Sequence, residues 1–214
     1  MSDSQSQDLA KGNLYIIAAP SGAGKTSLVH QLVTRFDHLK ISISYTTRPM
    51  RPGEVDGEDY RFVDETEFQK MVEEKAFLEH AEVHNYRYGT SHEWVLRQLE
   101  KGVDVILEID WQGARQIRQL FPSTVLIFIL PPSRKALRER LFNRKQDDAG
   151  VIEQRLEVGV SEMAHYHEFD YLVVNDDFDT ALDDLTHIVR AHRLECHRQR
   201  HVVSALLADL LGKQ

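Results

Sequence analysis

A glycine-rich segment near the start of the chain carries residue types that suit phosphate binding. In order, it contains Ala19, Pro20, Ser21, Gly22, Ala23, Gly24, Lys25 and Thr26. The glycines let the backbone fold around phosphate oxygens, Lys25 can reach the β and γ phosphates, and the Thr26 hydroxyl can coordinate Mg²⁺. Ala19 stands where the G-x-x-x-x-G-K-[ST] pattern has its first glycine. The segment predicts a site for a nucleoside triphosphate but specifies no reaction, and its plain alternative is a glycine-rich turn beside a surface lysine.

A second concentration of chemical groups lies between Ser44 and Tyr60, in a stretch rich in proline, glycine and charge. Arg48 and Arg51 stand three residues apart there, on a loop that two prolines constrain. Two guanidinium groups at this spacing can each hold phosphate oxygens. An isolated pair would be interpreted as solvated surface charge. Because these arginines lie beside turn residues in an acidic chain, they favour a ligand site.

A pair of carboxylates follows an apolar run in the middle of the chain. Glu108 and Asp110 are two residues apart, so we expect both on one side of a strand, at its ligand-binding end and with one of them near Mg²⁺. Asp110 to Gly113 also imitates the D-x-x-G motif of a GTPase. A GTPase would need an N-K-x-D motif later, and 143–146 ends in glutamine. A GTPase is therefore the lesser alternative.

The elements that position these groups follow from the apolar pattern. Runs at 14–19, 103–109 and 124–130 predict buried parallel strands, and shorter strands are expected at 39–42, 60–63, 77–84 and 171–174. Helices are predicted at 27–36, 64–75, 90–102, 133–145 and 151–165, with one long helix at the C-terminus. Asp64 and Thr90 each have a glutamate three residues later, as in a capping box. The fold class is α/β, a doubly wound parallel sheet with an insertion.

Composition excludes several classes of protein. The 214 residues are 42% hydrophobic and 28% charged, as in an ordinary globular chain, and the formal net charge of −8 argues against a nucleic-acid partner. The longest apolar run, Val125 to Leu130, is far short of the ~20 residues that cross a bilayer. A single cysteine and no signal-like N-terminus predict a cytoplasmic protein without a membrane partner.

The stretch from Ser44 to Tyr60 closely resembles the guanylate kinase family, and so do the phosphate loop and four later segments. Those segments are 77–90, 106–113, the arginines between 140 and 155, and 174–177, so the resemblance extends from about 14 to 180. It implies transfer of the γ-phosphoryl group of ATP to GMP or dGMP, giving ADP and GDP, with Mg²⁺. The alternative is a related scaffold domain that binds partner peptides without catalysis. Retention of Gly24, Lys25 and Thr26 favours the enzyme.

The resemblance also implies a GMP site, and the residue chemistry agrees with it. Guanidinium groups of Arg48 and Arg51 and hydroxyls of Tyr60 and Tyr88 would hold the monophosphate. Glu79 matches a glutamate that accepts hydrogen bonds from guanine N1–H and the 2-amino group. Adenine lacks both donors, so this carboxylate would discriminate against it. An outward-facing strand position is the plain alternative for Glu79. The other matching positions around the base are Ser44, Thr90 and Asp110.

The remaining implied residues concern ATP and Mg²⁺. Arg140, Arg144 and Arg155 match lid arginines that close over the triphosphate, and we expect Arg144 and Arg155 to be catalytic together with Lys25 and Arg48. Helix-surface arginines are the alternative. Asn175 matches a residue beside the adenine of ATP. Thr26 and Glu108 are the expected Mg²⁺ ligands, directly or through water, although the family usually has aspartate at the position of Glu108.

These assignments divide the chain into four parts. Residues 1–13 are expected to be a mobile leader, and 14–41, 101–136 and 158–214 a P-loop core. An inserted mixed α+β region at 42–100 would bind GMP, and a helical lid would occupy 137–157. The family usually reads Gly-Arg-Gly in this lid, whereas this chain has Asn143-Arg144-Lys145, which predicts a stiffer hinge. The C-terminal helix is a candidate surface for a homo-oligomer.

Overall fold

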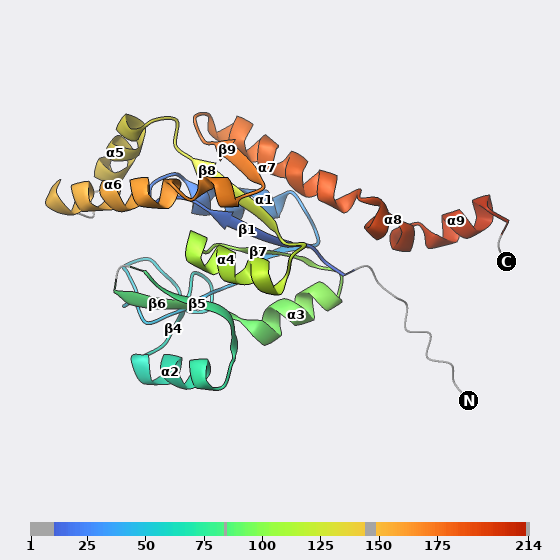
Figure 1. Ribbon diagram of the computed structural model, residues 1–214, viewed down its shortest axis with the longest axis horizontal. Coiled ribbons are helices and arrows are strands. Elements are labelled where there is room, and N and C mark those ends of the chain that lie inside the picture. The colour runs from blue at the N-terminus through green and yellow to red at the C-terminus, as the bar shows by residue number, and fades with distance from the viewer. Residues whose placement is uncertain (1–10, 84, 144–148, 213–214) are drawn as a thin grey trace.

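The computed structural model describes residues 11–83, 85–143 and 149–212. Five parallel strands form its central sheet in the order β2-β7-β1-β8-β9 (Figure 1). Their bounds are β1 Leu14–Ala18, β2 Leu39–Ile41, β7 Asp104–Leu107, β8 Val125–Leu130 and β9 Tyr171–Val174. The predicted α/β class with a parallel sheet is confirmed. Most of the proposed leader, residues 1–10, lies outside the described residues.

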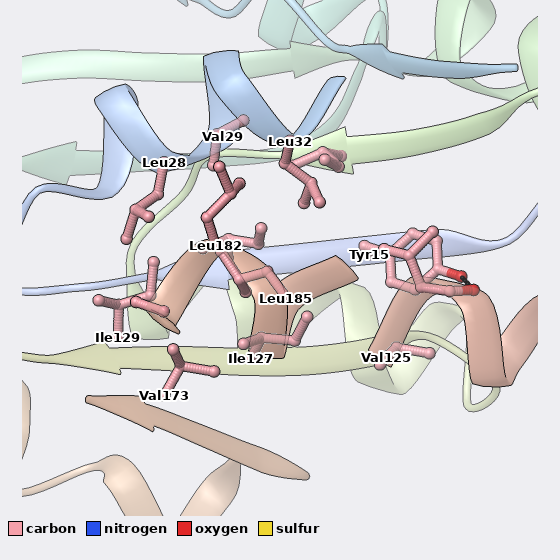
Figure 2. Close-up of a cluster of buried hydrophobic side chains, with 14 of the residues drawn as sticks. Tyr15, Leu28, Val29, Leu32, Val125, Ile127, Ile129, Val173, Leu182 and Leu185 are labelled. Atoms are coloured by element: carbon pink, nitrogen blue, oxygen red, sulfur yellow. Dashed lines mark hydrogen bonds between the residues drawn. The ribbon is translucent and has the colours of Figure 1, made fainter. Parts of the chain in front are cut away.

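Alternation along the buried strands divides the core into two layers. In β1, Tyr15 and Ile17 join the cluster beneath α1 (Lys25–Thr34) and α7 (Phe178–Arg193), which Figure 2 shows. Leu14 and Ile16, on the other face, join the cluster beneath α3 (His92–Glu100) and α4 (Trp111–Leu120). Successive strand side chains point to opposite faces, so an uninterrupted apolar run is what a sheet covered on both sides requires.

A second sheet of four strands lies within the predicted insertion, in the order β4-β3-β6-β5. Its strands are β3 Tyr45–Thr46, β4 Arg61–Phe62, β5 Phe77–Val83 and β6 Tyr86–Ser91, and α2 is Glu65–Glu73. Strand β6 was not predicted, because its sequence is polar and contains Gly89. It pairs antiparallel with both β3 and β5 and so holds this sheet together. The predicted cap of α2 is confirmed, since Asp64 accepts a hydrogen bond from the Glu67 N–H at 2.8 Å.

The remaining helices lie at the two ends of the molecule (Figure 1). Helices α5 (Arg134–Asn143) and α6 (Ala149–Met163) pack on each other through a small apolar cluster, and the short helix η1 (Tyr166–Glu168) follows. At the other end, α8 (Cys196–Val202) and α9 (Ser204–Leu210) extend away from the body. No described helix is long and apolar enough to cross a membrane.

The structure corrects the prediction of one long C-terminal helix, since α7 ends at Arg193 and a separate helix begins at Cys196. Arg193 Nε and Arg198 Nη1 both donate to the buried Asp104 carboxylate, at 2.7 and 2.9 Å. Residues five apart on a straight helix point about 140° away from each other, so an unbroken helix would not bring both arginines to one carboxylate.

Two predicted positions at the ends of elements were also wrong. Ser91, and not Thr90, caps α3 by accepting from the Trp94 N–H, because Thr90 lies inside β6. Glu108 and Asp110 follow β7 instead of ending it. Asp110 caps α4 and accepts from the Gly113 N–H at 2.9 Å. The two carboxylates therefore lie in the loop just beyond the carboxyl end of the strand.

Candidate active site

The glycine-rich loop lies between β1 and α1, as predicted. Gly22 and Gly24 have φ of 94° and 93°, a left-handed conformation that other residues rarely adopt. Lys25 is the first residue of α1, and the N-cap residue, Gly24, has no side chain that could cap the helix. The unpaired N–H groups and the helix dipole make such a helix start a site for anions.

Asn175 supports this loop through a side-chain hydrogen bond. It is only 5% exposed, and its side-chain amide donates to the Ala23 carbonyl at 2.7 Å. A Cβ at Gly24 would lie 2.4 Å from Asn175 Nδ2, which is too close for any other residue. The position therefore requires glycine for two reasons, the positive φ angle and the nearby amide. Arg140 Nη2 donates to the Asn175 carbonyl at 2.9 Å. Asn175, expected beside adenine, therefore contacts the phosphate loop, a role that sequence reasoning missed.

The predicted lid arginines have separate positions. Arg155 Nη2 donates to the Ser21 hydroxyl, which joins α6 directly to the phosphate loop. Arg140 reaches the end of β9 through Asn175. Arg144 lies outside the described residues. Helix α5 also contacts the loop, since a Cβ at Gly22 would lie 3.1 Å from side-chain atoms of both Leu137 and Leu141.

Arg48 is held in place by an ion pair that sequence reasoning missed. Its Nη2 and Nη1 atoms donate to the two carboxylate oxygens of Glu54 at 2.7 and 3.0 Å. Burial alone would raise the pKa of Glu54, but Arg48 and the Arg51 N–H, which donates to the same carboxylate, lower it. Arg48 is 7% exposed, whereas Arg51 is exposed. The signal for Glu54 was its position three residues after Arg51 in the same loop.

Aromatic side chains complete the surroundings of Arg48. Its guanidinium carbon lies 5.3 Å from the centre of the Tyr60 ring, and the Tyr60 and Tyr88 ring centres are 6.0 Å apart. Burial raises the pKa of Tyr60 to about 12, and nearby Tyr88 and Glu108 add to the shift. The Tyr60 hydroxyl therefore stays protonated at neutral pH and can donate to an anion. The structure thus brings together Arg48, Tyr60 and Tyr88 as predicted.

Glu79 points into the protein from β5, so the outward-facing alternative is wrong. It is 4% exposed and accepts from the Thr90 hydroxyl at 2.6 Å. A Cβ at Gly113 would lie 2.7 Å from Glu79 Oε2, so the start of α4 approaches this carboxylate closely. Burial raises the pKa of Glu79 to about 7, the Thr90 hydrogen bond opposes the shift, and the charge of Asp110 adds to it. Ser44 is also buried, and its carbonyl accepts from the Arg61 N–H at 2.9 Å.

Thr26 and Glu108 meet although 82 residues separate them. The Thr26 hydroxyl donates to Glu108 Oε2 at 3.2 Å. Hydroxyl and carboxylate oxygens are ligands that suit Mg²⁺, which usually takes one or two carboxylates and completes its shell with water and substrate phosphates. Among the described residues, no group of three or more histidine, cysteine or acidic side chains could hold a metal ion by itself. The pair fits a site that needs a phosphate to be complete.

Comparison with known proteins gives the family of this chain. The family model described as guanylate kinase matches residues 11–192. A guanylate kinase of Coxiella burnetii is 63% identical, over 95% of this chain and 99% of its own length. One of Methylococcus capsulatus is 55% identical, over 95% of this chain and all of its own.

A solved structure is similar as well. The crystal structure of guanylate kinase from Anaplasma phagocytophilum superposes with a TM-score of 0.76 at 31% identity, and the match covers 91% of this chain and 95% of that one. The family-model match and the two curated relatives extend over nearly the whole chain. This chain belongs to the guanylate kinase family.

Proposed function

We propose that this chain is an ATP:GMP phosphotransferase, which transfers the γ-phosphoryl group of ATP to GMP or dGMP and releases ADP and GDP. The observation that carries the proposal is the buried Glu79 carboxylate, held by Thr90 beside Asp110 and the start of α4. A buried carboxylate is costly unless a partner repays its loss of water. Guanine has two adjacent donors, N1–H and the 2-amino group, and so is a suitable partner.

The ATP side of the reaction is assigned to the phosphate loop, from Ala19 to Thr26. Its N–H groups would hold the β phosphate, and Lys25 would follow the charge that shifts from the γ-phosphoryl group to the β phosphate during transfer. Arg155 and Arg144 would neutralise the transferring group. Arg140 would act from the β9 side, and Asn175 would keep the loop in shape through the Ala23 carbonyl.

The GMP side is assigned to the second sheet and its Arg48 loop. Arg48, Arg51, Tyr60 and Tyr88 would hold the monophosphate, with Glu54 fixing the guanidinium of Arg48. Glu79, Ser44, Thr90 and Asp110 would hold the base. This carboxylate lowers the affinity for adenine, because adenine offers it no N1–H and no 2-amino group.

Thr26 and Glu108 would hold Mg²⁺, which neutralises phosphate charge and aligns the γ-phosphoryl group. Glu108 influences the pKa of Tyr60, so the expected metal site and the expected monophosphate site are close enough to interact. Catalysis then consists of alignment and charge neutralisation, without a covalent intermediate.

The division into parts remains a proposal of the same kind. Residues 14–41, 101–136 and 158–214 form the core, 42–100 the GMP-binding insertion and 137–157 the lid. We also propose a cytoplasmic enzyme with ATP and GMP as its small-molecule partners, without a nucleic-acid or membrane partner. The arm of α8 and α9, which exposes several leucines, is a candidate surface for self-association.

The test measures ADP release from ATP and Mg²⁺ with a panel of nucleoside monophosphates. We expect release that depends on GMP, a smaller rate with dGMP, and little with AMP, CMP or UMP. ATP-independent binding of GMP with no ADP release would favour the non-catalytic binding module. GTP hydrolysis without a monophosphate acceptor would favour the GTPase alternative.

A further inference from the structure

The second half of α6 lies directly against the phosphate loop. A Cβ at Gly159 would lie 3.3 Å from Pro20 Cβ, which is tighter than ordinary contact. Arg155, four residues earlier, donates to the Ser21 hydroxyl. Glu162 is three residues after Gly159 and therefore lies on the same face of the helix. Through Arg155 and Gly159, this face of α6 contacts Ser21 and Pro20 of the loop.

Glu162 and Arg155 face different groups of the same loop residue, Ser21. The Ser21 N–H faces the Glu162 carboxylate and lowers the pKa of Glu162, while Arg155 donates to the hydroxyl of the same residue. The charges that face Glu162 are Lys25 of α1, Asp110 at the start of α4, and Arg155 on its own helix. The Glu162 carboxylate thus lies beside a loop whose N–H groups suit anions, next to the lysine that is expected to contact the triphosphate.

The C-terminal end of α6 is held against α4, so the position of Glu162 does not depend on where the N-terminal end of the helix lies. The His165 ring stacks on Trp111 of α4, with ring centres 3.6 Å apart. Glu168 accepts from Arg115 at 2.7 and 3.0 Å and contacts His165 Nδ1 at 2.7 Å. These contacts join the end of α6 to α4, three residues after Glu162.

Glu162 has an electrostatic environment unlike that of a surface glutamate. Burial raises its pKa to about 7, and the charge of Asp110 adds to the shift. Lys25, the Ser21 N–H and Arg155 oppose it. Glu162 is half-buried, so its side chain loses part of its hydration at a cost, which is a reason to look for a role in the site.

We propose that Glu162 is a positioning residue for phosphoryl transfer, which holds Ser21 and the Lys25 ammonium in the arrangement that receives the triphosphate. The inference rests on the proposed function. Lysine has four rotatable side-chain bonds, so an ammonium without a counter-charge would populate many orientations. A fixed carboxylate beside it restricts these orientations before ATP arrives, and the loop keeps the shape that its N–H groups need.

The test compares three substitutions of Glu162. Glu162→Gln keeps an acceptor for the Ser21 N–H but removes the charge that faces Lys25, and Glu162→Ala removes both. Glu162→Asp restores the charge on a shorter side chain. Glu157→Gln is the matched control, because Glu157 is exposed on the same helix.

Two measurements are made on each full-length protein: kcat and KM for both substrates, and calorimetric affinity for a non-hydrolysable ATP analogue with Mg²⁺. Losing a hydrogen bond and a facing charge should weaken the analogue and raise KM for ATP by about tenfold in Glu162→Ala, with kcat reduced by a similar factor. KM for GMP should stay within about twofold. Glu162→Gln should be intermediate, Glu162→Asp should recover part of the loss, and Glu157→Gln should match the parent.

Two outcomes would overturn the inference. Parental analogue affinity and kcat in Glu162→Ala would show that Glu162 does not position the loop. Equal increases of KM for ATP and GMP would show a general loss of structure, and the nearly isosteric Glu162→Gln guards against a variant that fails to fold. A parent that binds the analogue but phosphorylates no GMP would refute the proposed function and leave the binding comparison intact.

Discussion

The two halves of the candidate active site would hold phosphate groups by different means. The phosphate loop presents main-chain N–H groups, whose directions follow from the positive φ of Gly22 and Gly24 and from the Asn175 brace. The Arg48 loop presents side chains, and an ion pair with Glu54 sets the direction of its main guanidinium. A main-chain site tolerates changes of side chain, as Ala19 illustrates. A side-chain site depends on each partner that orients it.

The expected ligands differ in the same way. The triphosphate carries its own large charge and needs donors in fixed directions, so a helix start and one lysine suffice for most of the recognition. The monophosphate has to be accompanied by the correct base, and we expect the buried carboxylate of Glu79 to select that base. Substitutions should therefore separate into those that affect transfer and those that affect choice and affinity of the acceptor.

The largest effect should follow from Lys25→Met on the main-chain side. Removing the ammonium that follows the shifting charge should reduce kcat by several orders of magnitude. Calorimetric affinity for GMP should remain nearly unchanged, because the expected GMP site lies on the second sheet. Turnover within tenfold of the parent would contradict the assignment of Lys25.

Glu79→Gln should have the next largest effect, on selectivity. Each charge-assisted hydrogen bond to guanine contributes ~1.5 to 3 kcal/mol, and the amide can accept only one of the two donors. We expect the ratio of kcat/KM for GMP to that for AMP to decrease at least tenfold, measured with saturating ATP. If the ratio does not change, Glu79 does not contact the base, and Ser44 and Asp110 become the candidates.

Arg48→Lys and Arg51→Lys test whether the side-chain site depends on a fixed geometry. Lysine keeps the charge but loses the planar fork, so KM for GMP should increase by about tenfold in Arg48→Lys while KM for ATP changes little. The increase should be smaller in Arg51→Lys, because Arg51 is exposed. An effect on ATP alone would mean that the two sites are reversed.

Glu54→Gln should have a smaller effect of the same kind. The amide cannot accept both guanidinium nitrogens of Arg48, so the arginine loses part of its orientation, and KM for GMP should increase by about threefold to tenfold. Glu58→Gln, in the same loop and exposed, is the control. A decrease of KM for GMP would instead show that the Glu54 carboxylate competes with the monophosphate for Arg48.

The smallest effect should be a pH dependence of GMP affinity. Guanine would donate to the ionised form of Glu79. Burial raises the pKa of this carboxyl group to about 7 without the ligand, so proton loss should accompany binding below that pH. GMP affinity should therefore decrease as the pH falls from 8 to 6. The GMP phosphate ionises near pH 6 in every variant, and only the part due to Glu79 should disappear in Glu79→Gln. Equal pH profiles in the two proteins would show that this carboxyl group does not titrate with binding.

The same raised pKa has a consequence for stability. A carboxyl group with a pKa near 4.5 in the unfolded chain and about 7 in the folded one favours unfolding as it ionises. At pH 4 the group is protonated in both states and does not affect stability. As the pH rises from about 4.5 to above 7, its ionisation should reduce the free energy of unfolding. Chemical denaturation of the parent and of Glu79→Gln at these pH values isolates it.

The amino-acid sequence alone determined the features that depend on neighbouring residues. The glycine spacing, the helix after it and the apolar runs predicted the phosphate loop and the parallel sheet, because a helix start or a strand depends on φ preferences and periodicity within a few residues. The family resemblance extended this to the pairing of Arg48 with Tyr60 and Tyr88 and to Glu79, and the structure brings the first three together and buries the fourth.

Only the tertiary structure decided the contacts between distant segments. The Asn175 amide on Ala23, the Thr90 hydroxyl on Glu79 and the Glu162 carboxylate facing Ser21 have no signature in the composition or spacing of the chain. Each depends on which strands are neighbours and how deeply a polar group is buried. A polar side chain that loses water must find a partner wherever the fold provides one, and that partner can be separated from it by more than a hundred residues.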